Sequence, residues 1–158
     1  MMAGANKVRT GDADVYEATG DAAVSAGSLV VPSTTAATNA GLQGVDTAGD
    51  AATDVLGVAA KKAVPVTAQT TSGSTPDGFP VTYVNSATEL TTVYKRAEVK
   101  VTYSAATAAF GAKLVSAADG AVRAFSSGDG DTADMIVGEC RAVGGVGSGG
   151  GVGLALIY

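Results

Sequence analysis

Apolar and polar side chains alternate most regularly between residues 94 and 104. Every second residue of this segment is apolar (Ala97, Val99, Val101 and Tyr103), and the residues between them are charged or polar. A period of two over this length predicts a β-strand with one face in the core and the other in water.

Two further segments predict strands and turns. Within residues 113–125, Asp119-Gly120 separates two apolar runs, and this pair favours the positive φ angles of a two-residue hairpin turn. Residues 154–158 predict a buried last strand. The residues before it, 144–151, are mostly glycine and predict a loop.

The strand pattern occurs twice along the chain. Residues 26–31 resemble residues 110–115, and residues 50–57 resemble residues 131–138. Leu29 lies 28 positions before Gly57, and Leu114 lies 24 positions before Gly138. We therefore predict a weak internal duplication, with half-repeats at about 24–63 and 109–143, in a small β-barrel or β-clip (β-tulip-like) domain. Chance similarity in a chain rich in Ala, Gly and Val is the alternative.

The predicted fold class is all-β, with at most one or two short helices. Ser86-Ala-Thr-Glu89 fits a capping box that begins one helix, and the Ala-rich residues 104–109 could form another turn. The composition of residues 68–80 predicts a polar loop. Residues 1–14 form an expected extended N-terminal arm, and residues 15–158 a single domain.

Composition predicts a thin core. The chain has 31 Ala and 22 Gly, whereas Leu, Ile, Val and Phe together number 33 of 158 residues. The net charge of −5 and a mean hydropathy of +0.26 exclude disorder of the whole chain. Because so little apolar surface must offset the backbone entropy of folding, we expect the subunit to associate with copies of itself.

Missing residue types exclude several functions. The chain has no His and a single Cys, Cys140, which excludes Ser-His-Asp and Cys-His catalysis and His/Cys zinc sites. We expect no enzyme activity, no cofactor and no metal. A pI of about 4.5 argues against nucleic-acid binding. We expect no signal peptide, because no apolar segment follows Lys7 and Arg9. The long uncharged stretch 22–45 is broken by Pro and Gly, so no membrane span is predicted.

Residues 129–134 are the densest acidic segment, and hard cations such as Ca²⁺ bind where several carboxylate oxygens meet. Their spacing departs from an EF-hand loop, since the sixth position is Asp134 in place of Gly. We interpret the segment as a solvated acidic loop, with a Ca²⁺ module as the alternative.

The order of these segments over residues 15–158 resembles the head decoration (capsid cement) proteins of tailed bacteriophages. The segments that carry the likeness are residues 16–21, 24–31, 55–59, 99–103, 110–115, 119–122, 136–140 and 154–157. The resemblance implies a structural virion protein, made in the host cytoplasm, that coats the outer surface of the expanded capsid. It implies a homotrimer that bridges subunits of the major capsid protein.

The resemblance also implies contact residues. An N-terminal arm that completes a sheet of the capsid protein would bring Asn6, Lys7, Val8, Arg9, Thr10 and Val15 to the capsid. Small residues permit close packing around an axis, so Gly144, Gly145, Val146 and Gly147 are the candidates for contacts between copies. The alternatives are another virion component, such as a tail or fibre subunit, or a small β-clip module that binds a ligand.

Overall fold

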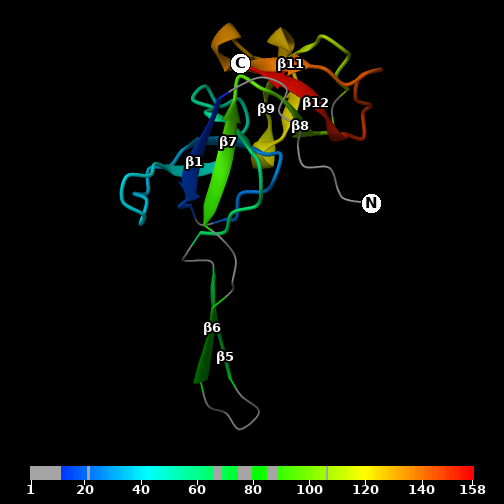
Figure 1. Cartoon of the computed structure of the whole chain (residues 1–158). Helices are drawn as coiled ribbons and strands as arrows, with labels where there is room; N and C mark the ends of the chain where they lie inside the picture. The colour runs from blue at the N-terminus through cyan, green and yellow to red at the C-terminus, as the bar shows by residue number, and fades with distance from the viewer. Residues whose placement is uncertain (1–11, 21, 66–68, 75–79, 85–88, 106) are drawn as a thin grey trace, which may run out of the picture.

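The computed structural model describes residues 12–158 except 21, 66–68, 75–79, 85–88 and 106. It contains two closed five-stranded barrels and a separate two-stranded sheet (Figure 1). The helical segments among the described residues are 3₁₀ turns of three residues each: Ala118–Gly120, Ser127–Asp129 and Ala133–Met135. The all-β prediction is therefore confirmed.

Barrel 1 has the strand order β1-β3-β2-β4-β7. Its strands are β1 (Asp12–Ala18), β2 (Leu29–Pro32), β3 (Gly44–Thr47), β4 (Gly57–Ala59) and β7 (Leu90–Lys95). β1 and β7 pair in antiparallel fashion along six positions and close the barrel. A small apolar cluster, which includes Tyr16, Val30, Val45 and Val93, belongs to this barrel alone.

Barrel 2 has the order β10-β8-β12-β11-β9. Its strands are β8 (Glu98–Tyr103), β9 (Lys113–Ser116), β10 (Val122–Ala124), β11 (Ile136–Cys140) and β12 (Gly151–Ile157). On β8, Val99, Val101 and Tyr103 are buried and alternate with outward polar residues, as the sequence pattern predicts. Cys140 is also fully buried.

The two barrels share one topology. β1, β2, β3, β4 and β7 correspond in order to β8, β9, β10, β11 and β12, and each pair of neighbours in barrel 1 has a counterpart of the same direction in barrel 2. Of the similar segments, residues 26–31 and 110–115 run into the equivalent strands β2 and β9, and residues 50–57 and 131–138 lead into the equivalent strands β4 and β11. Each copy closes a barrel of its own, however, and the first and last strands of each barrel lie outside half-repeats 24–63 and 109–143.

The regular alternation over residues 94–104 does not form one strand. β7 ends at Lys95 and β8 begins at Glu98, so the two ends of the segment belong to different barrels. The chain turns at Arg96, whose φ is 50°. The alternation persists through the turn, because each strand has its own buried and outward faces, and so the pattern cannot reveal the break.

Three other local expectations meet mixed outcomes. Asp119 and Gly120 both have positive φ, 58° and 71°, and lie in the turn between β9 and β10, as predicted, but the turn is not a two-residue hairpin, because Ser116 pairs with Val122 and five residues separate the strands. The predicted polar loop 68–80 instead contains β5 (Thr70–Ser74), and β6 (Pro80–Val84) pairs with it. The two predicted helices do not form in the described residues, because β7 begins directly after Glu89 and the described part of 104–109 is irregular.

The barrels pack against each other as one body. Leu29 and Val58, from the outside of barrel 1, are fully buried in an apolar cluster made mostly of barrel 2 residues. Backbone hydrogen bonds cross the same interface, for example from Gly120 N to Ala48 O at 2.9 Å. The thin core predicted from composition is thus divided between two barrels that share apolar surface.

Candidate interaction surfaces

The residues predicted to contact a capsid fall into two groups. Asn6, Lys7, Val8, Arg9 and Thr10 lie outside the described residues. Val15 lies on β1 opposite Thr92 and is 51% exposed. Residues 12–14, which the sequence assigns to the arm, form the first part of β1 and pair with β7, so the strand begins inside the predicted arm.

The glycine-rich segment is a loop with one internal anchor. Val146 pairs with Ala108 through two backbone hydrogen bonds of 2.7 and 2.9 Å, and a Cβ on Gly145 would lie 2.6 Å from Ala108 O. Gly144 and Gly147 have open space beside them. Two of the four candidates for contacts between copies are therefore held within their own barrel, and a role for Gly144 and Gly147 stays a prediction.

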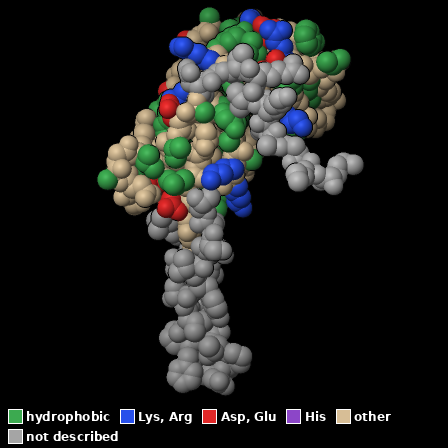
Figure 2. Space-filling model, in the orientation of Figure 1, with side chains coloured by type: hydrophobic (Ala, Val, Ile, Leu, Met, Phe, Trp, Pro, Cys, Tyr) green, Lys and Arg blue, Asp and Glu red, His purple; other side chains and the backbone are tan. Residues whose placement is uncertain are grey.

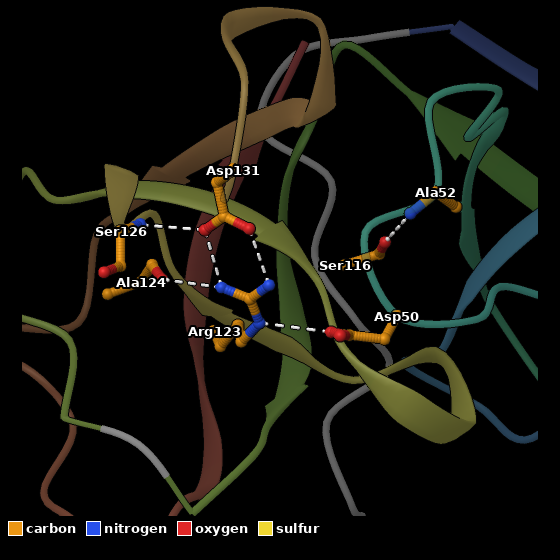
Figure 3. Close-up of polar contacts among 7 residues, drawn as sticks. All are labelled: Asp50, Ala52, Ser116, Arg123, Ala124, Ser126 and Asp131. Carbon is orange, nitrogen blue, oxygen red and sulfur yellow. Dashed lines mark hydrogen bonds and ion pairs between the residues drawn. The ribbon is translucent and has the colours of Figure 1, made fainter. Parts of the chain in front are cut away.

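Arg123 links the two barrels (Figure 3). Its guanidinium donates two hydrogen bonds to the Asp131 carboxylate, at 2.6 and 2.7 Å, and a third to Asp50 of barrel 1 at 3.1 Å. Asp131 is 7% exposed and also accepts a bond from Ser126 N, whereas the Asp50 side chain is 61% exposed. The bidentate bond to Arg123 holds the pKa of Asp131 below its ordinary value, and the same bond raises the pKa of Arg123.

This arrangement changes the interpretation of the acidic segment 129–134. Asp131 does not lie in water, because it is the buried partner of Arg123. Asp129 and Asp134 are exposed. No three His, Cys, Asp or Glu side chains of the described residues lie close enough together to hold a metal ion.

Glu17 fastens the long loop between β2 and β3. Its buried carboxylate accepts hydrogen bonds from the backbone N–H and side chain of Thr38 (2.9 and 2.6 Å) and of Asn39 (2.8 and 2.7 Å). Burial by itself would raise the pKa of Glu17, but the four bonds outweigh it and lower the pKa to about 2. Barrel 2 has a five-residue turn in the place of this loop.

Several exposed apolar side chains lie on barrel 2. We define the β12 face as Phe110, Val143, Val152, Leu154 and Leu156. Val152 is 72% exposed, Val143 is 96% exposed, and Phe110 is 58% exposed. Phe110, Val143 and Leu154 line a groove of about 330 Å³ together with Glu98 and Arg141. In Figure 2, hydrophobic side chains alternate with charges of both signs over this end of the body.

A two-stranded ribbon is the second unusual surface. β5 and β6 extend away from both barrels (Figure 1), and among the described strands each pairs only with the other. Neither strand contains a charged residue. Charges and prolines commonly protect the edges of a sheet, and β5 has neither, so its free edge is open to pairing with another strand.

A groove beside β3 bears on the ligand-binding alternative. It has a volume of about 360 Å³ and is lined by Gly20, Ala22, Thr34, Thr35, Asp46 and Thr47. Of its lining residues that the structure describes, one is a carboxylate, three are threonines and none is aromatic, unlike the mostly apolar walls of common small-molecule sites.

Comparison with known proteins shows the fold. No protein-family model matches the chain, and no curated protein matches it. Among solved structures, the chain is similar to the head fiber gp8.5 N base of bacteriophage phi29, with a TM-score of 0.57 and 14% identity over 93% of this chain and 95% of that one. It is also similar to the pre-mature gene product 12 of phi29, with a TM-score of 0.53 and 15% identity.

The two matches differ in extent. The chain spans nearly the whole head fiber base but only 23% of the length of gene product 12. At these identities the likeness establishes a common fold and no more. The described residues contain no helix with the length and hydrophobicity of a transmembrane span.

Sequence reasoning missed the β12 face, the ribbon and the roles of Arg123 and Glu17. The alternation of Val152, Leu154 and Leu156 with smaller residues was available as a signal for the first. No sequence signal pairs Glu17 with residues 38–39 or Arg123 with Asp50, because these contacts join distant parts of the chain.

Proposed function

We propose that this chain is a non-enzymatic structural protein of a bacteriophage virion that binds the outer surface of the expanded capsid and stabilises it by bridging major capsid protein subunits. The observation that carries the proposal is the fold shared with the phi29 head fiber base, which extends over almost the full length of both chains. The resemblance to capsid decoration proteins, noted from the order of the sequence segments, supports the same class of function.

The surfaces of the protein suit such a role. A free strand edge on β5 and an exposed apolar face on barrel 2 are means of binding other proteins. Binding only the expanded shell would stabilise that state by mass action at every site, so a modest affinity at one site becomes large over the whole particle.

Cosedimentation with capsids tests the proposal. Purified chain is mixed with expanded capsids and with unexpanded precursors of the virus that encodes it, and the bound fraction is measured. We expect saturable binding to expanded capsids and a higher temperature of capsid disruption. Electron microscopy of the same particles would then show density for the chain on the outer surface. Absence of binding would overturn the proposal.

The predicted arm can be tested in the same assay. Since β1 begins at Asp12, the suitable deletion removes residues 1–11 and leaves the barrel intact. We expect the shortened chain to fold with the stability of the full chain and to lose binding to capsids. Undiminished binding would show that Asn6, Lys7, Val8, Arg9 and Thr10 are not the contact residues.

A second candidate function is the base of a fiber that projects from the capsid. The likeness to a head fiber base favours it directly, because the chain covers 95% of that structure. Microscopy separates the two candidates: a decoration protein gives compact density on the shell, and a fiber base gives density that continues outward into a further domain or protein.

A further inference from the structure

The relation between the two barrels shows where a second copy of this chain would bind. Leu29, Val58 and Tyr94 stand side by side on β2, β4 and β7. This side of barrel 1 packs against barrel 2, and both Leu29 and Val58 are fully buried there. The outer side of β2, β4 and β7 is therefore a protein-binding face within the chain.

Barrel 2 turns the equivalent side outward. The counterparts of those residues are Lys113, Glu139 and Leu156 on β9, β11 and β12. Lys113 and Glu139 form an ion pair of 3.1 Å at the surface. Leu156 is half-buried and begins the apolar row of β12, which continues outward through Leu154 and Val152.

A barrel of another copy cannot pack against barrel 1 in the way that barrel 1 packs against barrel 2. In the contact between barrels, Thr102 N donates a hydrogen bond to Gly27 O at 3.3 Å. The counterpart of Thr102 is Glu17, whose N–H donates to Gln43 O of the chain's own loop at 3.2 Å. The Glu17 carboxylate also binds Thr38 and Asn39 of this loop. The loop therefore covers the side of barrel 1 that is equivalent to the side of barrel 2 on which barrel 1 packs, and it prevents barrels of successive copies from stacking head to tail.

The charges around the β12 face favour another copy of the same chain. Lys100 and Glu98 stand opposite Leu154 and Leu156, and Arg141, whose guanidinium lies 5.9 Å from the Phe110 ring centre, bonds to Glu139 at 3.3 Å. With Lys113, the charged residues number three basic and two acidic, while the whole chain carries −5. The face thus carries both signs and a net charge of only +1, so a basic side chain of one copy can pair with an acidic side chain of another.

We propose that the β12 face is the surface through which copies of this chain associate, with the face turned toward a common axis. The proposal goes beyond the proposed function and names a site for the self-association that the composition predicts. It does not depend on capsid binding. Val143, Phe110 and Val152, which are largely exposed in the single chain, would be buried in the oligomer, together with the groove that Phe110, Val143 and Leu154 line with Arg141.

The test is the mass of the full chain in solution, measured by sedimentation equilibrium over a wide range of concentration. We expect the wild type to form a discrete multiple of 15.3 kDa. Leu154→Glu places an unpaired charge in the contact and is expected to weaken association at least about tenfold. Val143→Asp gives a second variant that cannot disturb folding, because Val143 is 96% exposed. Val15→Glu is the matched control on β1 and should leave the mass unchanged.

The outcomes are distinct. A wild type that stays at 15.3 kDa at all concentrations overturns the inference. So does an oligomer that Leu154→Glu and Val143→Asp leave at wild-type affinity, although self-association through another surface would then stand. Failure of the oligomer to bind capsids would overturn the proposed function but not the inference that copies associate through the β12 face.

Discussion

Gly57 and Gly138 occupy equivalent positions in the two barrels. A Cβ on either residue would lie 2.3 Å from a carbonyl oxygen of the neighbouring strand, that of Tyr94 for Gly57 and that of Leu156 for Gly138. The strands approach so closely at this point of each barrel that only glycine fits.

We predict that Gly57→Ala and Gly138→Ala each lower the free energy of unfolding by about 3 kcal/mol, because the obstructing atom is backbone and cannot move aside. Urea denaturation followed by circular dichroism measures the change. Gly149→Ala is the control, since nothing lies within 4 Å of its Cβ position. A loss below about 1 kcal/mol at Gly138 would mean that the barrel can widen there.

The two carboxylates on Arg123 should differ sharply in their effect on stability. Asp131→Asn removes one half of a buried bidentate pair and is expected to cost about 3–5 kcal/mol. Asp50→Asn removes an exposed partner of the same guanidinium and should cost at most about 1 kcal/mol. Thermal and urea unfolding of both variants checks the comparison, and equal losses would contradict the assignment of Asp131 as the structural partner.

Glu17→Gln should loosen the loop between β2 and β3. The Gln amide would turn an NH₂ group toward Thr38 or Asn39, whose donors bond to the carboxylate in the wild type. We expect the free energy of unfolding to fall by about 2–3 kcal/mol. Hydrogen exchange should become faster at the amides of Thr38 and Asn39. Asp14→Asn, which breaks only the exposed ion pair with Lys95, is the control and should leave exchange in the loop unchanged.

Acid should destabilise the protein through the same carboxylate. The pKa of Glu17 is about 2 in the folded protein against 4.5 as its ordinary value. A lowered pKa gives stability that is present above pH 4.5 and is lost as the pH falls toward 2, and the difference corresponds to about 3 kcal/mol.

The comparison of variants isolates that contribution. Asp131 and Glu139 also have lowered pKa values, from Arg123 and Lys113, and contribute in the same direction. We therefore expect the wild type to lose stability between pH 4.5 and pH 2, and Glu17→Gln to lose about 3 kcal/mol less over that range. Parallel curves for the two proteins would show that Glu17 is not the group responsible.

The ribbon should be dispensable for folding. Barrel 2 joins its equivalent strands, after the Val146–Ala108 bridge, by residues 147–150 alone. Replacement of residues 64–89 by the residues 147–151 of the same chain is expected to leave a cooperatively folding protein, since barrel 1 closes without β5 and β6. Loss of cooperative unfolding would show that the ribbon supports barrel 1.

The sequence alone settles the fold class and much of the local structure. The alternation on β8, the positive φ of Asp119 and Gly120, and the two similar segments are local signals, because side-chain period and turn chemistry act over a few residues. The division at Arg96 left no such signal, since the alternation runs through it. The candidate contact residues at 6–10 were inferred from resemblance and lie outside what the structure describes.

The tertiary structure decides how the repeats are used. It alone shows that each repeat closes its own barrel and that Arg123 joins Asp131 to Asp50 across the interface between the barrels. It also shows that the side of the barrel that is buried in barrel 1 is exposed in barrel 2. These relations depend on closure and packing between residues far apart in the sequence, such as Arg123 and Asp50, which are 73 positions apart. A local pattern carries the preference of a residue for a strand or a turn, but it does not carry the identity of the distant partner that buries it.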